Sequence, residues 1–214
     1  MTEKEIIQRT ENFVKNKLKK AEGGHDWWHI YRVRNNAMKI AATESGDKLI
    51  VELGALLHDI ADSKFHDGDE SIGPRRAGEF LQSLGVDWQD INHIKKIIQH
   101  ISFKGGNFDR EFYSDELAIL QDADRLDALG AIGIARAFNY GGFKGRALYD
   151  PDIAPELNMS VDQYKKSTAP TINHFYEKLL LLKDRMNTAT GKKMAQERHD
   201  FILTYLEQFY REWE

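Results

Sequence analysis

Apolar side chains recur at intervals of three and four residues along most of the chain, which is the spacing of one face of an α-helix. The strict alternation of apolar and polar residues that is typical of a β-strand does not occur in the sequence. Glycine pairs and isolated prolines interrupt the periodic segments. The pattern therefore predicts an all-α protein, with helices from about residue 3 to 20, from 26 to an end by Gly46, and from 47 to either 57 or 60. Further helices are predicted over about residues 74–85, 91–101, 115–139, 170–186 and 192–213.

Two parts of this pattern leave alternatives open. The segment 115–139 is either one long helix or two helices joined near Gly130 to Gly133. The segment from Gly141 to Thr168 is rich in glycine, aspartate and proline, and it reads either as a loop beside a pocket or as a linker. Neither segment contains an internal repeat or a low-complexity tract.

The helix predicted over 47–60 is the most apolar of the set, and it delivers His58 and Asp59 to its end. The chain has four His-Asp pairs, but only this one follows an uninterrupted apolar turn. Burial of an unpaired carboxylate costs several kcal/mol, so such a pair is normally matched by a cation, a metal ion or many hydrogen bonds. The apolar context of His58 and Asp59 therefore predicts a functional site in which such a partner matches the pair.

Composition narrows the class of protein. The 214 residues include 41% hydrophobic and 30% charged residues, which is ordinary for a folded helical chain. The formal net charge of -4 gives no basic surface for a nucleic acid polymer, and the absence of cysteine excludes disulfides, thiol catalysis and cysteine-ligated metals. No segment is apolar enough for a membrane span or a leader, so a cytoplasmic location is expected.

Two imidazoles and two carboxylates fall on apolar helix faces, namely His29, His58, Asp59 and Asp124. Imidazole and carboxylate together suit a first-row divalent ion, with water in the remaining positions. Each residue taken alone also has a plain structural interpretation, as a core histidine with its hydrogen bonds satisfied or as a helix-capping aspartate. The joint occurrence favours one bound divalent metal: Mn, Mg, Co, Ni, Fe or Zn.

These residues resemble the His, His-Asp, Asp signature of the HD-domain metal-dependent phosphohydrolase superfamily. The similarity extends to 24–37 (GHDWWHIYRVRNNA), 56–65 (LLHDIADSKF), 97–103, 121–136 (QDADRLDALGAIGIAR) and the tail 171–213, which look like a bacterial subgroup of small stand-alone HD proteins. The resemblance implies a single HD-type helical domain over residues 1–214, with a core at about 20–140 and a C-terminal helical extension at about 160–214. It also implies that the four side chains hold one metal, manganese being favoured, whose bound water attacks phosphorus.

The same resemblance implies catalytic roles for Asp59 and Asp62. Asp62 lies three residues after Asp59, hence on the same helical face if the turn continues, and it is similar in position to the acid that orients water in HD pyrophosphohydrolases. The other interpretation of Asp62 is a solvated carboxylate at a helix end.

Cations near this site should meet the negative charge of a phosphorylated substrate. The candidates are Lys64, His100, Lys104 and Arg125. Arg125 is equally consistent with a salt bridge behind the site, and Lys104 with a solvated loop lysine. His100 is also open to interpretation as a second-metal ligand or a histidine that satisfies a helix C-terminus.

The sequence therefore favours a phosphohydrolase that acts on a small phosphorylated metabolite, most plausibly a nucleotide. The reaction is either phosphate removal or the splitting of a nucleoside triphosphate into monophosphate and pyrophosphate, and the second is favoured. Two alternatives remain: a non-catalytic nucleotide sensor whose metal holds the phosphates, and a di-iron oxygenase, which would need further ligands. The C-terminal apolar pattern fits either a core or a homodimer contact; it consists of Phe201, Leu203, Tyr205, Leu206, Phe209 and Trp213.

Overall fold

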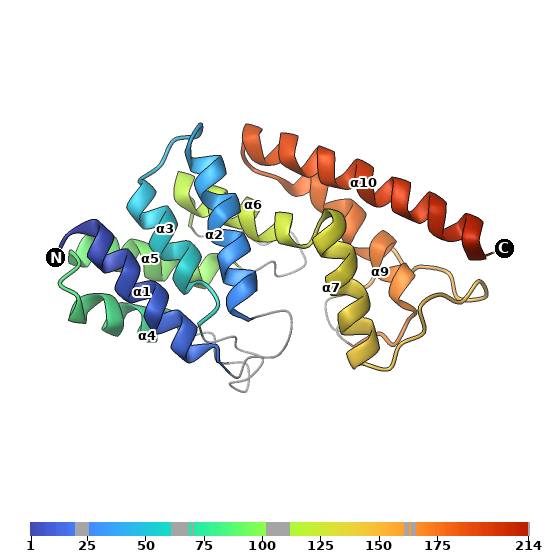
Figure 1. Cartoon of the computed structure of the whole chain (residues 1–214), viewed down its shortest axis with the longest axis horizontal. Coiled ribbons are helices and arrows are strands. Elements are labelled where there is room, and N and C mark those ends of the chain that lie inside the picture. Colours follow the sequence, from blue (N-terminus) through green and yellow to red (C-terminus); the bar gives the residue numbers. More distant parts are fainter. Residues whose placement is uncertain are drawn as a thin grey trace. The chain divides into compact units, whose positions relative to one another are not determined.

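The computed structural model describes residues 1–19, 26–60, 69, 71–101, 112–160, 163 and 166–213. Every regular element in these ranges is a helix, which confirms the predicted all-α class. In chain order (Figure 1) they are α1 (Glu3–Lys17), α2 (Trp27–Ala41), α3 (Lys48–Leu57), α4 (Ile72–Ser83), α5 (Trp88–His100), α6 (Asp115–Asp127), α7 (Gly130–Phe143), α9 (Thr171–Glu177), the 3-10 helix η2 (Leu179–Arg185) and α10 (Ala189–Trp213). None of the helices in these ranges is both long enough and apolar enough for a membrane crossing.

The chain forms two compact units. The first comprises Met1–Phe103 and Arg110–Ala123, and the second comprises Lys104–Asp109 and Asp124–Glu214. Their boundary falls inside α6, between Ala123 and Asp124. The single domain over residues 1–214, with its core and extension, stays a prediction.

Helix α3 is the centre of the first unit, where α1, α2 and α5 all pack against it. All its side chains from Ile50 to Leu57 except that of Glu52 are buried, as expected for a helix that is apolar on nearly every side. Gly54 permits the close approach of α6, because a Cβ atom there would lie 2.6 Å from the Leu120 Cδ1 atom. The apolar sequence of α3 is thus explained by its central place.

Aspartate side chains begin three helices of the first unit. Asp26 accepts a hydrogen bond from the His29 backbone N–H at 3.0 Å, which confirms the N-cap predicted for α2. Asp47 accepts from Leu49 and Ile50 at the start of α3, at 2.8 and 3.1 Å, and Asp87 caps α5. These caps fix the residue at which each helix begins, and hence the phase of its side chains.

In the second unit, α7 packs against α9 and α10, and η2 packs against the same two elements. Its interior is aromatic: Phe175 is fully buried, and its ring centroid lies 5.8 Å from that of Phe138 and 6.0 Å from that of Tyr205. Of the C-terminal apolar pattern, Leu206 is buried and Tyr205 and Phe209 are half-buried, so these residues contribute to the core of this unit, whereas Phe201, Leu203 and Trp213 are exposed. A homodimer contact stays the alternative interpretation of the exposed positions.

Several helix ends differ from the sequence prediction. The segment 115–139 is two helices, because Gly130 adopts a φ of 68° that an L side chain rarely takes. Helix α7 then continues to Phe143, so the predicted loop starts later. Helices α4 and α5 begin at Ile72 and Trp88, ahead of the predicted starts.

The C-terminal helices differ more. The helix predicted over 170–186 is divided into α9 and η2 at Lys178, whose φ of -142° and ψ of -57° are not helical. Gly191, expected as a break, lies buried inside α10, and its backbone N–H donates to the Thr188 side chain at 2.9 Å. The hydroxyl serves as a cap, so the helix begins before the glycine.

Candidate metal centre

The first turn of α2 carries His29 into the interior of the first unit. Its side chain is only 2% exposed, and its backbone N–H is held by the Asp26 cap. Two residues earlier, Trp27 is half-buried and stacks under the Lys15 ammonium, which lies 4.5 Å from the ring centroid. Trp28 instead is 60% exposed, with its ring edge-on to that of Tyr31. The helix thus buries the imidazole while one tryptophan remains at the surface.

His58 lies at the C-terminal end of α3, as its C-cap. Its Nδ1 atom is 2.8 Å from the Ala55 carbonyl oxygen of the same helix. Since a carbonyl oxygen only accepts, Nδ1 carries the proton, and in the neutral ring Nε2 presents a lone pair. The backbone of α3 therefore fixes both the tautomer and the direction of this imidazole, which is the arrangement common to metal-ligating histidines.

The Nε2 atom of His58 faces the Nε2 atom of His29 at 3.3 Å. Two nitrogens that each bind one metal at about 2.1 Å are about 3.0 Å apart at a 90° angle and about 3.4 Å apart at a tetrahedral angle. Asp59 joins them, since one ligand atom from each of the three residues lies within 4.8 Å of the others. The donor set and its spacing therefore fit a divalent cation held by two imidazoles and a carboxylate.

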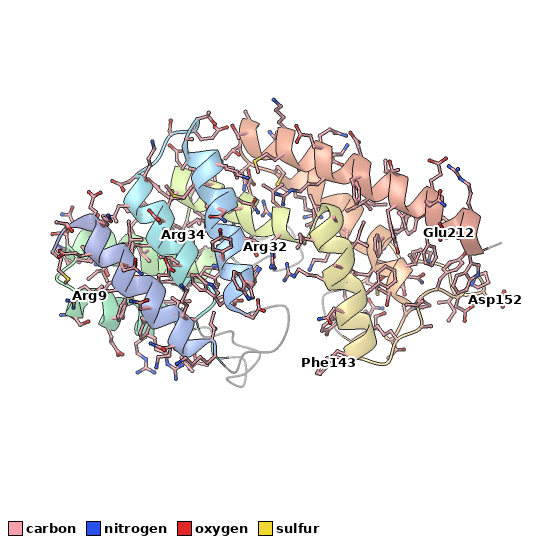
Figure 2. All side chains as sticks on the ribbon, in the orientation of Figure 1. Arg9, Arg32, Arg34, Phe143, Asp152 and Glu212 are labelled. Carbon is pink, nitrogen blue, oxygen red and sulfur yellow. The ribbon has the colours of Figure 1, made fainter. Side chains whose placement is uncertain are left out.

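An ion-pair network holds the helices that carry these three groups. Arg34 of α2, labelled in Figure 2, donates from Nε to Glu52 of α3 at 2.8 Å and from a terminal nitrogen to Glu11 of α1 at 3.2 Å. A second terminal nitrogen also contacts Glu52. All three side chains are largely shielded from solvent, so screening by water is weak. The network fixes α2 against α3, and with it His29 against His58.

Helix α6 is tied to the same framework at two places. At its start, the Glu116 carboxylate accepts from the Asp47 backbone N–H at 2.8 Å and lies 3.4 Å from the His93 ring. Near its end, the Ala123 carbonyl accepts from the Asn36 carboxamide of α2 at 3.3 Å. Asp124, the fourth predicted ligand, is half-buried and is the next residue of the chain. It belongs to the second unit and is not a member of the three-residue cluster.

Of the remaining predicted site residues, only His100 and Arg125 lie within the described residues, and neither belongs to the three-residue cluster. Asp62, Lys64 and Lys104 lie outside the described residues. His100 is half-buried at the end of α5, where its ring centroid lies 5.7 Å from that of Phe112 and its carbonyl accepts from Gln121. Arg125 donates to the Arg185 carbonyl at 2.6 Å within the second unit.

Sequence analysis missed Asn36 and Arg34. Asn36 lies seven residues after His29, which is two helical turns, and a polar residue at that position of an apolar face was a usable signal. Arg34 does not lie on the apolar face, so the hydrophobic pattern gives no signal for it. Its partners Glu11 and Glu52 belong to other helices.

Comparison with known proteins agrees with this arrangement. The HD domain family matches residues 27–129, a range that includes His29, His58, Asp59 and Asp124. The uncharacterized protein YpgQ of Bacillus subtilis is 36% identical over 213 residues, which cover 99% of this chain and 96% of that protein.

Two solved structures are similar over nearly the whole chain. A crystal structure described as a HD-superfamily hydrolase from Bacillus thuringiensis matches with a TM-score of 0.80 and 43% identity, over 99% of this chain and 98% of that chain. The crystal structure of Bacillus subtilis YpgQ in complex with ADP matches with a TM-score of 0.76 and 36% identity, over 99% and 97% of the two chains. A His, His-Asp cluster with one buried and two half-buried members, on an all-helical scaffold, together with these matches, shows that the chain belongs to the HD-domain family.

Proposed function

We propose that this protein is a divalent-metal-dependent phosphohydrolase that acts on a nucleotide. The observation that carries the proposal is the cluster of His29, His58 and Asp59, whose donor atoms are spaced as ligands of one cation. The proposed fourth ligand is Asp124, which lies within the part of the chain that matches the HD domain. Manganese is the favoured ion, because it accepts imidazole and carboxylate ligands and keeps water in its open positions.

A divalent ion bound by these groups supplies a water molecule of lowered pKa and neutralises charge on a phosphoryl oxygen. The protein supplies orientation. Hydrogen bonding of His58 Nδ1 to the Ala55 carbonyl keeps its Nε2 directed at the cation, and the Asp26 cap holds the turn that presents His29. Asp62 is proposed to accept the proton of the attacking water.

The proposed substrate contacts are cationic, with Lys64, Lys104 and His100 facing the phosphate groups. Arg125 is assigned more weakly, because its bond to the Arg185 carbonyl supports the alternative role of holding η2. That YpgQ was crystallised with ADP supports a nucleotide as the substrate class here. Between the two reactions we favour release of pyrophosphate from a nucleoside triphosphate, on the basis of Asp62.

The test is a product assay with metal-stripped protein. We would incubate it with ribo- and deoxynucleoside mono-, di- and triphosphates plus manganese, magnesium, cobalt or nickel, and separate phosphate from pyrophosphate. Pyrophosphate from triphosphates is the expected product. Phosphate alone would replace the proposed reaction by a phosphatase.

Variants then connect the activity to the site. Asp59→Ala should lower kcat/KM by about 10³-fold or more, because the ion contributes several kcal/mol to the transition state. Asp62→Asn should retain the metal and lower kcat by about 10²-fold or more. The matched control is Asp184→Asn, an exposed carboxylate of η2 whose loss should change neither value.

A nucleotide sensor is the second candidate, because an ADP complex of a relative is also what a binding protein would give. A sensor would bind nucleotide and metal with the same ligands, yet release no product with any metal. Binding measured by calorimetry alongside the product assay distinguishes the two functions. Metal content of two irons per chain would instead favour the oxygenase alternative.

A further inference from the structure

Asn36 is one of the buried polar side chains of the first unit, with only 5% of it exposed. Its carboxamide nitrogen donates a hydrogen bond to the Ala123 carbonyl oxygen at 3.3 Å. The two residues are 87 positions apart in the sequence, and both ends of the bond are buried. The bond is therefore a specific tie between α2 and α6 rather than a local turn contact.

Asn36, which makes this bond, lies on the same face of α2 as His29 of the metal-ligand cluster. Asn36 lies seven positions after His29, and at about 100° per residue this is two turns less about 20°. His29 and Asn36 are both buried on α2, as are Ile30, Val33 and Ala37 around them. One face of α2 thus presents an imidazole to the cluster and, two turns later, a carboxamide to α6.

The acceptor is also specific in its chemistry. The Ala123 carbonyl belongs to the peptide group whose nitrogen is that of Asp124, and a peptide group is planar. A hydrogen bond to this oxygen helps to fix the orientation of the peptide plane that contains the Asp124 Cα atom. Asp124 itself is half-buried.

We infer that Asn36 is a positioning residue for the metal site, which holds the peptide bond before Asp124 and thereby sets where that carboxylate is presented. The inference rests on the proposed function, in which Asp124 is a ligand. Packing alone would be met as well by leucine, which has a similar volume and no donor. The carboxamide, unlike leucine, directs a donor at the Ala123 carbonyl oxygen.

The first measurement compares metal affinity in the parent protein and in Asn36→Leu, by titration of metal-stripped protein with Mn²⁺ and detection of free ion by electron paramagnetic resonance. Loss of a group that orients a ligand typically costs 10–100-fold in affinity, and we expect about 10-fold here. Asn36→Gln keeps the donor, displaced by one methylene, and should bind Mn²⁺ more tightly than Asn36→Leu. It also provides a folded variant if the leucine variant is unstable.

Asn173→Leu is the matched control. Asn173 is 1% exposed, and its carboxamide nitrogen likewise donates to a backbone carbonyl, that of Ile153 at 3.0 Å. The substitution and the lost bond are therefore of the same kind, on a helix that carries no predicted ligand. Its Mn²⁺ affinity should equal that of the parent protein, and an equal loss in both variants would overturn the inference.

A double-mutant cycle with Asp124→Ala separates the inference from the function on which it rests. If Asn36 acts through Asp124, Asn36→Leu should cause no further loss of Mn²⁺ affinity in the Asp124→Ala background. An equal loss in both backgrounds, or unchanged affinity of Asn36→Leu while Asp124→Ala binds weakly, would overturn the role of Asn36 alone. Unchanged affinity of Asp124→Ala would overturn the proposed ligand set as well.

Discussion

The two compact units are stabilised by different kinds of side chain. The first is packed mainly with aliphatic residues, and its fully buried large side chains include Ile30, Leu53, Leu56 and Ile97. The second also buries aliphatic side chains such as Leu182 and Ile202, but it adds a cluster of rings. Contacting rings among Phe138, Phe175, Tyr205 and Phe209 have centroids 5.8 to 6.4 Å apart, and the Tyr149 centroid lies 5.2 Å from that of Trp213.

This difference matches the geometry that each unit provides. Compact aliphatic side chains allow helices to pack closely. In the first unit, Gly54 of α3 lies close to Leu120 of α6, and His29 and His58 from α2 and α3 lie 3.3 Å apart. Aromatic rings cover more area and give strong contacts through their edges and faces. The stability of the first unit therefore depends on tight helix spacing, and that of the second on a few large aromatic contacts.

Removal of one ring should therefore have the largest effect on stability. Phe175→Ala is expected to lower the free energy of unfolding by about 3–5 kcal/mol, because it leaves a cavity among Phe138 and Tyr205. Urea denaturation followed by circular dichroism measures the change. Phe201→Ala is the control, since Phe201 is 51% exposed and should change stability by only about 0.5 kcal/mol. A loss of under about 1 kcal/mol for Phe175→Ala would contradict the comparison.

Acidification should weaken the second unit through His174. Burial lowers the pKa of His174 to about 3, and the nearby Lys178 and Arg146 charges act in the same direction. The unfolded chain takes up a proton below about pH 6.5 whereas the folded protein does not until about pH 3, so stability falls as the pH falls through this window.

The size of this effect is about 2 kcal/mol at pH 5 relative to pH 8. His174→Gln lacks the titrating group, so its stability should decline less over the same range. Chemical denaturation of both proteins at pH 8, 6 and 5 checks the difference. Parallel declines would show that His174 does not carry this part of the pH dependence.

A single methyl group should disturb the close spacing of the first unit. Gly54→Ala gains about 1 kcal/mol of helix propensity, but its Cβ would meet Leu120 Cδ1 at 2.6 Å, and overpacking of this kind costs about 1–3 kcal/mol. We expect a net loss of about 1 kcal/mol in the free energy of unfolding. A stabilised variant would show that α3 and α6 have more room than the structure gives them.

The same substitution in the second unit should have the opposite sign. A Cβ at Gly142, in the last turn of α7, would meet no atom within 4 Å. Gly142→Ala should therefore stabilise the protein by about 0.5 kcal/mol, through helix propensity alone. Thermal melts of the two alanine variants, run side by side, give the sign of each change.

Much of the first unit was predictable from sequence because its signals are local. The apolar run before His58 predicted a buried helix, and Asp26 predicted the start of α2. The juxtaposition of His29 with His58 and Asp59 followed from the resemblance to a family rather than from periodicity.

The rest depended on contacts between residues far apart in the chain. The tie from Asn36 to Ala123 and the network around Arg34 join separate helices, and no local pattern encodes such pairs. The break at Lys178 was missed because the flanking residues, including Leu179 to Leu182, favour a continuous helix on propensity alone. There the packing of η2 against α9 and α10 prevails over local preference.

The register of α2 limits how this segment can change in length. His29 and Asn36 lie on one face of α2, two turns apart, and Arg34 lies on another face. Each side chain contacts its own partner: His58, Ala123 and Glu52, respectively. Substitution at exposed positions such as Tyr31 and Asn35 leaves these directions intact. Insertion or deletion of one residue between 29 and 36 would turn one part of the helix by about 100° against the other. The segment is therefore free to vary in sequence at its surface, yet not in its number of residues.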